Sequence, residues 1–474
     1  VGGLIVGLLL YYGAGDKVPL GVADVIEARA LKQARLDARK GLISWLASAL
    51  SLGFGASAGR EGPAVLAGAT ISSALSSVLK LSPVQARTIL GCGVAAAVSA
   101  SFNAPLAGAL FALEVVLGHY AIRAFAPIMI ASVSGAVISR THFEDIPAFL
   151  LPVAEFGSYA QFPAFAILGL LAAVTAGVMM SSIFYARDVI DDFRESIGVP
   201  AWAQPVVAGA ALGLMALAFP HTIAVGYQVT TLALAGEIGF WTCVVFAATK
   251  VMAVAIALGG RFAGGVFSPA LLVGALVGSA FGAVAIDIFP SVSGSQALYA
   301  IAGMGAVAGA VLGAPISTTL IVFEMTGDYD TAVAASIATA VATVATQQMF
   351  GRSFFQWQLA RRGVDLSAGP QSFLLPSITV RSMMRPRGSE TSPSEIAAWA
   401  LVEQGAVLKN SDTLARAFPM FDRGGAAQGK MAFLPVVDDR VEGQGQTLIG
   451  TLHYVDALRA YNRALVEVHE EEHS

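Results

Sequence analysis

Long apolar runs separated by short polar breaks fill the chain as far as residue 350. A helix needs about 20 mostly apolar residues to cross the hydrocarbon core of a bilayer, and some runs are shorter than that or interrupted by glycine. The pattern therefore predicts an all-α polytopic membrane protein whose helices break within the membrane. The predicted apolar segments are residues 2–12, 42–58, 89–117, 163–183, 205–219, 240–258, 270–288, 298–322 and 332–350.

Composition agrees with a membrane protein. Of the 474 residues, 56% are hydrophobic and 13% are charged, whereas soluble proteins carry about 25% charged residues. The 50 glycines and 20 prolines favour helices that pack closely and break in the bilayer. The net charge of −4 carries little information about partners, and we expect no nucleic-acid partner. Cys92 and Cys243 lie in apolar segments, so we expect buried thiols, and we expect neither a metal nor an enzyme cofactor.

The polar segments indicate an orientation. The stretch "EARALKQARLDARKG" (27–41) holds more basic than acidic residues, which favours the cytoplasmic side of the membrane. We expect the hydrophilic C-terminal part on the same side. The chain begins inside an apolar run, so we also expect an N-terminal portion to precede it.

The membrane part repeats itself. Two segments recur later in the same order and at nearly the same offset, and the second alignment places Glu114 on Glu324. Gly/Ala-rich membrane sequence is often self-similar, but two ordered matches favour a duplicated unit, as in transporters and channels whose site lies between inverted halves. The pairs are "GREGPAVLAGATISSAL" from Gly59 with "GVFSPALLVGALVGSAF" from Gly265, and "FNAPLAGALFALE" from Phe102 with "LGAPISTTLIVFE" from Leu312.

The first repeated motif is typical of a helix start. Pro63 is well placed as the first residue of a helix, and Gly59 and Gly62 let the backbone turn and expose its N–H groups. A helix N-terminus carries partial positive charge and free donors. Pro269 recurs in the same setting in the second half. Two such ends facing one point would form an anion site without a cationic side chain, so the bound ion could still leave.

Glu61 stands at that helix start beside Arg60. A carboxylate there can occupy the anion site and be displaced by a mobile anion or by protonation. The alternative is a charged pair at a membrane boundary, with both side chains reaching into the headgroups. The repeat favours the gating interpretation, because the equivalent of Glu61 is the uncharged Phe267.

Other polar residues of the membrane part have simpler interpretations. Glu114 and Glu324 are acids within the membrane and therefore candidates for function, but their symmetric placement favours capping of broken helices. We expect Lys250 and Arg261 at membrane interfaces. "GASAG" matches the G-x-S-x-G motif of serine hydrolases around Ser57, which would require a preceding strand and a His partner.

Together, the motifs "GREGP", "GGVFSP", "FNAPLAGALFALE" and "GAPISTTLIVFEMTGDYD" resemble the CLC chloride channels and proton/chloride exchangers. The resemblance covers residues 1–362, with the first one or two family helices missing. It implies a homodimer in the lipid bilayer, each subunit having its own pore built from two inverted repeats.

By this resemblance, Glu61 is the gating glutamate. The backbone N–H groups of Arg60, Glu61 and Gly62 would line an outer anion site. Those of Val266 and Phe267 would line a central one.

Three positions depart from the family pattern. The family's central serine falls on Leu20, next to Gly21 in "PLGVADVIEA", and the tyrosine facing the central anion falls on Phe355. Both hydroxyls are then missing. The inner proton-transfer glutamate of exchangers falls on Val115. The sequence therefore favours a voltage-gated-type channel that conducts chloride passively through the membrane, with a proton-coupled chloride antiporter as the alternative.

The remaining residues, 363–474, resemble a CBS domain, a small α/β regulatory module. "SITV", "MAFLPVVDD" and "TLIGTLHYVDAL" are strand-like, and the loop "RPRGSETSPSE" is polar. A nucleotide is a candidate ligand, although no residue commits to one. The tail leaves a further alternative, a protein that is chiefly a ligand-sensing regulator. The location implied is the inner or plasma membrane of a bacterium, with the tail in the cytoplasm.

Overall fold

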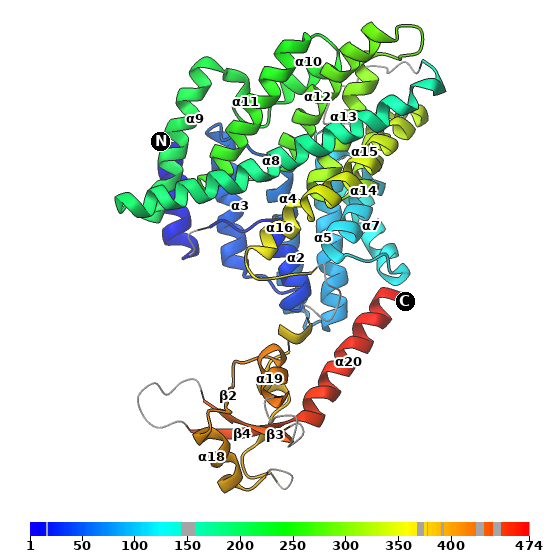
Figure 1. Cartoon of the computed structure of the whole chain (residues 1–474). Helices are drawn as coiled ribbons and strands as arrows, with labels where there is room; N and C mark the ends of the chain where they lie inside the picture. The colour runs from blue at the N-terminus through cyan, green and yellow to red at the C-terminus, as the bar shows by residue number, and fades with distance from the viewer. Residues whose placement is uncertain are drawn as a thin grey trace. The chain divides into compact units, whose positions relative to one another are not determined.

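The structure is a computed structural model that describes residues 1–15, 18–143, 157–366, 374–376, 378–389, 393–422, 431–438 and 447–473. The chain divides into two compact units. The first comprises Val1–Arg29 and Gln33–Gln358, and the second comprises Ala30–Lys32 and Leu359–Ser474. Their elements are labelled in Figure 1.

The first unit is helical. Its first half contains α1 (Gly2–Leu8), the π-helix η1 (Leu9–Ala14), α2 (Val22–Leu31), α3 (Ala38–Gly53), α4 (Glu61–Val78), α5 (Pro83–Phe102), α6 (Pro105–Phe111), the π-helix η2 (Ala112–Leu117) and α7 (Ile122–Phe143). Its second half contains α8 (Phe162–Ile197), α9 (Gln204–Ala218), α10 (Tyr227–Leu234), α11 (Phe240–Gly259), α12 (Phe267–Ile288), α13 (Gln296–Leu312), α14 (Pro315–Thr326), α15 (Tyr329–Phe350) and α16 (Phe354–Ala360).

Six stretches among the described residues are long and apolar enough to cross a membrane. The prediction of a polytopic membrane protein agrees with this count. One of the six, Ile122–Phe143, was missing from the predicted segments. The polar and charged residues at its two ends and the internal Pro127 interrupt the apolar pattern in the sequence. The helix itself exposes many apolar side chains on its surface.

Two of the predicted apolar segments are broken into helix pairs. Residues 89–117 break at Asn103 and residues 298–322 at Gly313, and both residues adopt left-handed backbone conformations. Pro105 and Pro315 then start the next helices. Gly313 suits this position because it adopts positive φ without strain. Asn103 tolerates the same conformation better than most residues. The two breaks fall at equivalent points of the repeat.

A second feature confirms the duplication. Helices α4 and α5 approach closely at Gly68 and Gly93, and α12 and α13 approach in the same way at Gly274 and Gly303. A β-carbon on any of these four glycines would collide with the backbone of the facing helix. Small residues permit such approaches in membrane proteins, where close backbone packing replaces the hydrophobic drive between helices.

The second unit contains a four-stranded sheet with the order β1-β4-β3-β2. β3 pairs antiparallel with β4 and parallel with β2. The strands "MAFLPVVDD" and "TLIGTLHYVDAL" form as predicted, but "SITV" contributes the 3-10 turn Val380–Ser382 instead. Part of the predicted polar loop lies outside the described residues. The elements are β1 (Arg385–Pro386), α18 (Glu395–Glu403), β2 (Leu408–Lys409), α19 (Leu414–Phe421), β3 (Phe433–Val437), β4 (Leu448–His453) and α20 (Tyr454–His473).

An ion pair joins β1 to α20. Arg385 Nε donates to Asp456 Oδ2 at 2.6 Å, and this bond lowers the pKa of Asp456 below its ordinary value. The pair therefore stabilises the unit above the unfolded-state pKa of about 3.9, and the stabilisation is lost as the pH falls through the lower folded-state value. Because both side chains are partly exposed, the effect is about 0.5–1 kcal/mol.

We expect Asp456→Asn to speed hydrogen exchange of residues 448–460 in the full chain at pH 7 by about two- to fivefold. The difference from the wild type should shrink as the pH falls below about 4 and vanish once the pH is below the lowered pKa of folded Asp456. The exposed Glu403→Gln is the matched control. Equal protection of Asp456→Asn and wild type at pH 7 would show that the pair contributes nothing.

Candidate functional site

Gly59 and Gly265 bring the two repeated helix starts together. The Gly59 N–H donates to the Gly265 carbonyl at 2.7 Å, and the Gly265 N–H donates to the Gly59 carbonyl at 2.9 Å. The pairing is antiparallel, as expected between inverted halves. A β-carbon on Gly59 would approach Glu61 Oε2 to 2.9 Å, and one on Gly265 would approach Gly62 N to 2.9 Å. The Gly62 backbone therefore leaves no room for a β-carbon on Gly265, whereas a β-carbon on Gly59 would mainly displace the Glu61 carboxylate.

Glu61 is the first residue of α4, and its side chain is buried (3% exposed). Its Oε2 accepts a hydrogen bond from the Ser268 hydroxyl at 2.5 Å. The backbone N–H groups of Glu61 and Ser268 also face the carboxylate. Oε1 accepts no hydrogen bond from any described group. The carboxylate therefore occupies the position at the start of α12 where a mobile anion would find N–H donors.

Arg60 lies beside Glu61 but points elsewhere. Its Nε is 3.7 Å from Glu61 Oε1, too far for a hydrogen bond. Its guanidinium stacks 5.2 Å from the Tyr227 ring centre and donates to the Ser101 carbonyl at 3.3 Å. The side chain is 48% exposed. Arg60 thus balances the buried carboxylate only weakly, and its side chain lines a different hollow.

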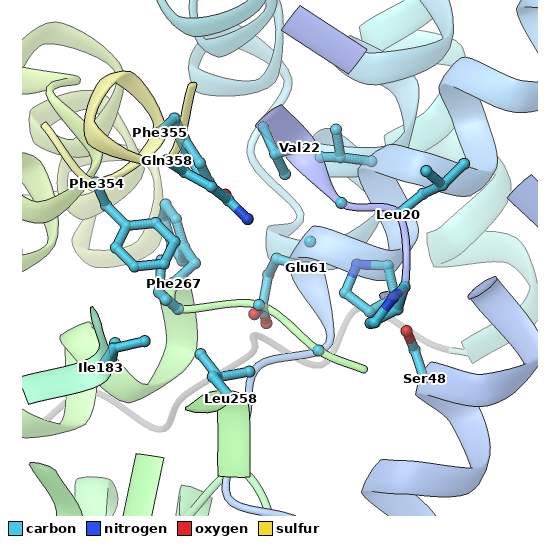
Figure 2. A pocket seen from close by; sticks show the side chains of 18 of the residues that line it. Leu20, Val22, Ser48, Glu61, Ile183, Leu258, Phe267, Phe354, Phe355 and Gln358 are labelled. Atoms are coloured by element: carbon cyan, nitrogen blue, oxygen red, sulfur yellow. The ribbon is translucent and has the colours of Figure 1, made fainter. Parts of the chain in front are cut away.

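A cavity of about 100 Å³ lies against Glu61 (Figure 2). It has room for a few water-sized particles, which is the scale of a small anion. Most of the residues predicted for the anion path line it, although Arg60 and Val115 do not. The predicted residues on its wall are Leu20, Gly21, Glu61, Gly62, Val266, Phe267 and Phe355.

The cavity wall around Leu20 has few hydrogen-bond donors free to bind an anion. The Leu20 N–H donates to Ser44 Oγ at 3.0 Å, and the Gly21 N–H donates to Asp24 Oδ2 at 2.8 Å. These two amide hydrogens are thus used inside the protein. The Leu20 side chain adds only methyl groups, and so this wall presents an apolar surface.

Phe267 belongs to a cluster of aromatic rings on the cavity wall. Its ring centre lies 4.9 Å from that of Phe102 and 6.3 Å from that of Phe111. Phe355 adds a further ring without a hydroxyl. Val115 lies in η2, whose π-helical turn follows α6, and its side chain cannot carry a proton.

Glu114 and Glu324 cap each other's helices. Glu324 accepts from the N–H groups of Leu106 and Ala107, at 2.9 and 2.7 Å, at the start of α6. Glu114 accepts from Ile316 and Ser317, at 3.0 and 2.8 Å, at the start of α14, and also from the Ser317 hydroxyl. The capping interpretation is confirmed. Each acid satisfies the orphan donors of the other half's broken helix.

Two basic residues that were expected at membrane interfaces are buried within the fold. Lys250 is fully buried, and its ammonium donates to the carbonyls of Thr222 and Ala224 at 3.2 and 2.7 Å. Arg261 is also buried and pairs with Asp191 at 2.7 Å. In both cases acceptors inside the fold compensate the buried charge, which sequence spacing does not reveal.

The hydrolase interpretation of Ser57 also fails. Ser57 follows helix α3 rather than a strand. Its hydroxyl is buried and makes no hydrogen bond with any described group, so no base activates it.

Sequence reasoning missed two polar residues on the site. Ser268 directly follows Phe267 in "GGVFSP", and Gln358 lies one helical turn after Phe355. A helix places residues three apart on one face, so the spacing of Phe355 and Gln358 was a usable signal. The contact between Ser268 and Glu61 joins different halves of the repeat and had no local signal.

Fold and site define a class: a membrane transport protein in which two equivalent helix starts meet at a buried, carboxylate-occupied site. A family model described as "Voltage gated chloride channel" matches residues 2–347. The chain therefore belongs to this family, the CLC chloride channels and exchangers.

Relatives and solved structures agree. A ClcB-like protein of Ralstonia nicotianae is 30% identical over 77% of this chain and 85% of its own length. The "H(+)/Cl(-) exchange transporter ClcA" of Salmonella paratyphi B is 30% identical over 66% of each chain. The structure of a "slow cyanobacterial Cl-/H+ antiporter" has a TM-score of 0.69 and 25% identity, covering 76% of this chain and 85% of its own.

Proposed function

We propose that this protein exchanges chloride for protons across the membrane, with Glu61 as the group that both closes the anion path and carries the proton. The observation that carries the proposal is the place of the Glu61 carboxylate, buried at the start of α12 and held by Ser268. A carboxylate and an anion compete for the same donors there. Entry of one requires the other to leave.

Protonation links this competition to proton movement. A neutral carboxyl group is attracted less by the start of α12 and can swing away, which opens the position to chloride. Once the carboxyl group has released its proton on the other side, the carboxylate returns to the start of α12 and expels the anion. The relatives named as proton/chloride exchangers support this cycle.

A passive chloride channel, favoured by the sequence, is the second candidate. Val115 lies where exchangers have their inner proton acceptor, so the proton needs another route past the cavity. If no such proton route exists, Glu61 gates chloride flux without coupling it to proton movement.

Flux from liposomes separates the two. Vesicles loaded with chloride and placed in low chloride at equal pH should take up protons as chloride leaves, and a protonophore should abolish the proton gradient. Protein-free vesicles are the control. Chloride efflux without proton uptake would overturn the exchange proposal and leave the channel.

We also propose a homodimer in a bacterial inner or plasma membrane, with residues 363–474 as a cytoplasmic CBS-like regulatory domain. The family assignment supports the first part, and the sheet with its flanking helices supports the second. Light scattering of the solubilised full chain tests the dimer, and a monomer at working concentration would contradict it. Titration with ATP tests a nucleotide ligand, and no binding would remove it.

A further inference from the structure

The polar side chains on the cavity next to Glu61 are few, so each can be accounted for. Apart from Glu61 itself, they are Ser48, Arg187, Arg261 and Gln358. The hydroxyls that the family places at the positions of Leu20 and Phe355 are missing. An anion in the cavity therefore needs its side-chain donors from this short set.

Most of the set is already engaged. The Ser48 hydroxyl donates to the Ser44 carbonyl at 2.9 Å, and the adjacent Ser268 hydroxyl donates to Glu61. Arg261 is paired with Asp191. Arg187 also interacts with another group of the protein.

Gln358 differs from these residues. Its side chain lies on the cavity wall, on the same face of α16 as Phe355, and Figure 2 shows the amide end extending into the cavity. No described group forms a hydrogen bond with this amide. A carboxamide has two N–H donors, and because no partner fixes its orientation it can turn them toward a ligand.

We propose that Gln358 is an anion ligand of this protein, donating an amide N–H to chloride in the cavity in place of the missing serine and tyrosine hydroxyls. The proposal rests on chloride passing this cavity, as the proposed function requires. The amide is neutral, so it strengthens binding without the tight hold of a cationic ligand. It makes Gln358 a determinant of anion affinity rather than of proton movement.

Chloride titration into the purified full chain tests the proposal. Gln358→Met keeps the length of the side chain but removes its donors, and we expect about 10-fold weaker chloride binding. Gln348→Met on the exposed end of α15 is the matched control and should bind as the wild type does. Gln358→Glu is the second variant, nearly identical in shape, and should bind chloride worse still at neutral pH because the carboxylate repels the anion.

Wild-type affinity in Gln358→Met or in Gln358→Glu would overturn the proposal, as would a wild-type chain that binds no chloride. The binding assay does not depend on coupling. Weakened binding in the variants without proton uptake in liposomes would therefore leave the Gln358 ligand intact and reject exchange alone. Proton uptake by the wild type, together with wild-type chloride affinity in Gln358→Met, would support exchange and reject Gln358 as an anion ligand.

Discussion

Replacement of Glu61 by glutamine is expected to make chloride flux nearly independent of pH and to stop proton movement. One titrating carboxyl group changes flux by at most about tenfold per pH unit, and we expect less than about twofold in Glu61→Gln. The amide has the shape of the protonated acid but cannot release a proton. Chloride efflux and proton uptake, measured on the same liposomes at several pH values, check both parts.

Two further variants sharpen this experiment. Glu237→Gln, on an exposed loop between α10 and α11, should respond to pH as the wild type does. Ser268→Ala keeps the acid but removes the hydroxyl that holds it, so we expect faster chloride flux at neutral pH with coupling retained. A full pH response in Glu61→Gln would mean that another group sets the pH dependence and that Glu61 is not the gate.

Removal of Glu324 is expected to destabilise the membrane unit clearly. In Glu324→Ala, the N–H groups of Leu106 and Ala107 lose their acceptor at a partly buried helix start, at a cost of about 1–3 kcal/mol. Thermal unfolding of the full chain in detergent, followed by tryptophan fluorescence, should show a clearly lowered midpoint. Glu324→Gln keeps one acceptor oxygen and should lie between the alanine variant and the wild type.

Glu114 offers an internal comparison. Glu114→Ala removes the acceptor for two N–H groups and the Ser317 hydroxyl at the start of α14, so its effect should be similar in size. Glu237→Ala serves as the control, since its side chain is exposed. An unchanged midpoint in Glu324→Ala would show that water replaces the carboxylate and that the cap is dispensable.

The repeat carried most of what the sequence could predict. Motifs at matching offsets indicated two equivalent helix starts, and the structure joins them at Gly59 and Gly265. The broken helices were also predictable, because Asn103 and Gly313, both suited to a left-handed turn, stand two residues before Pro105 and Pro315. These features are local, so sequence is sufficient to find them.

What the sequence missed depends on partners from elsewhere in the chain. Lys250 reads as a boundary charge until the carbonyls of Thr222 and Ala224 are brought to its ammonium group. Ser268 reads as part of a helix start until Glu61, from the other half of the repeat, is seated beside its hydroxyl. Long-range pairs such as these are decided by packing, and a single sequence contains no record of them.

The paired backbone bonds at Gly59 and Gly265 limit how this protein can move. Many carriers expose a central site to each side in turn by rocking one half against the other. Here such rocking would break the two hydrogen bonds between Gly59 and Gly265, beside the proposed ion path. It would also separate the starts of α6 and α14 from the capping carboxylates of Glu324 and Glu114. We therefore expect the two halves of the membrane unit to stay fixed relative to each other during transport. Passage is left to short swings of side chains, above all that of Glu61.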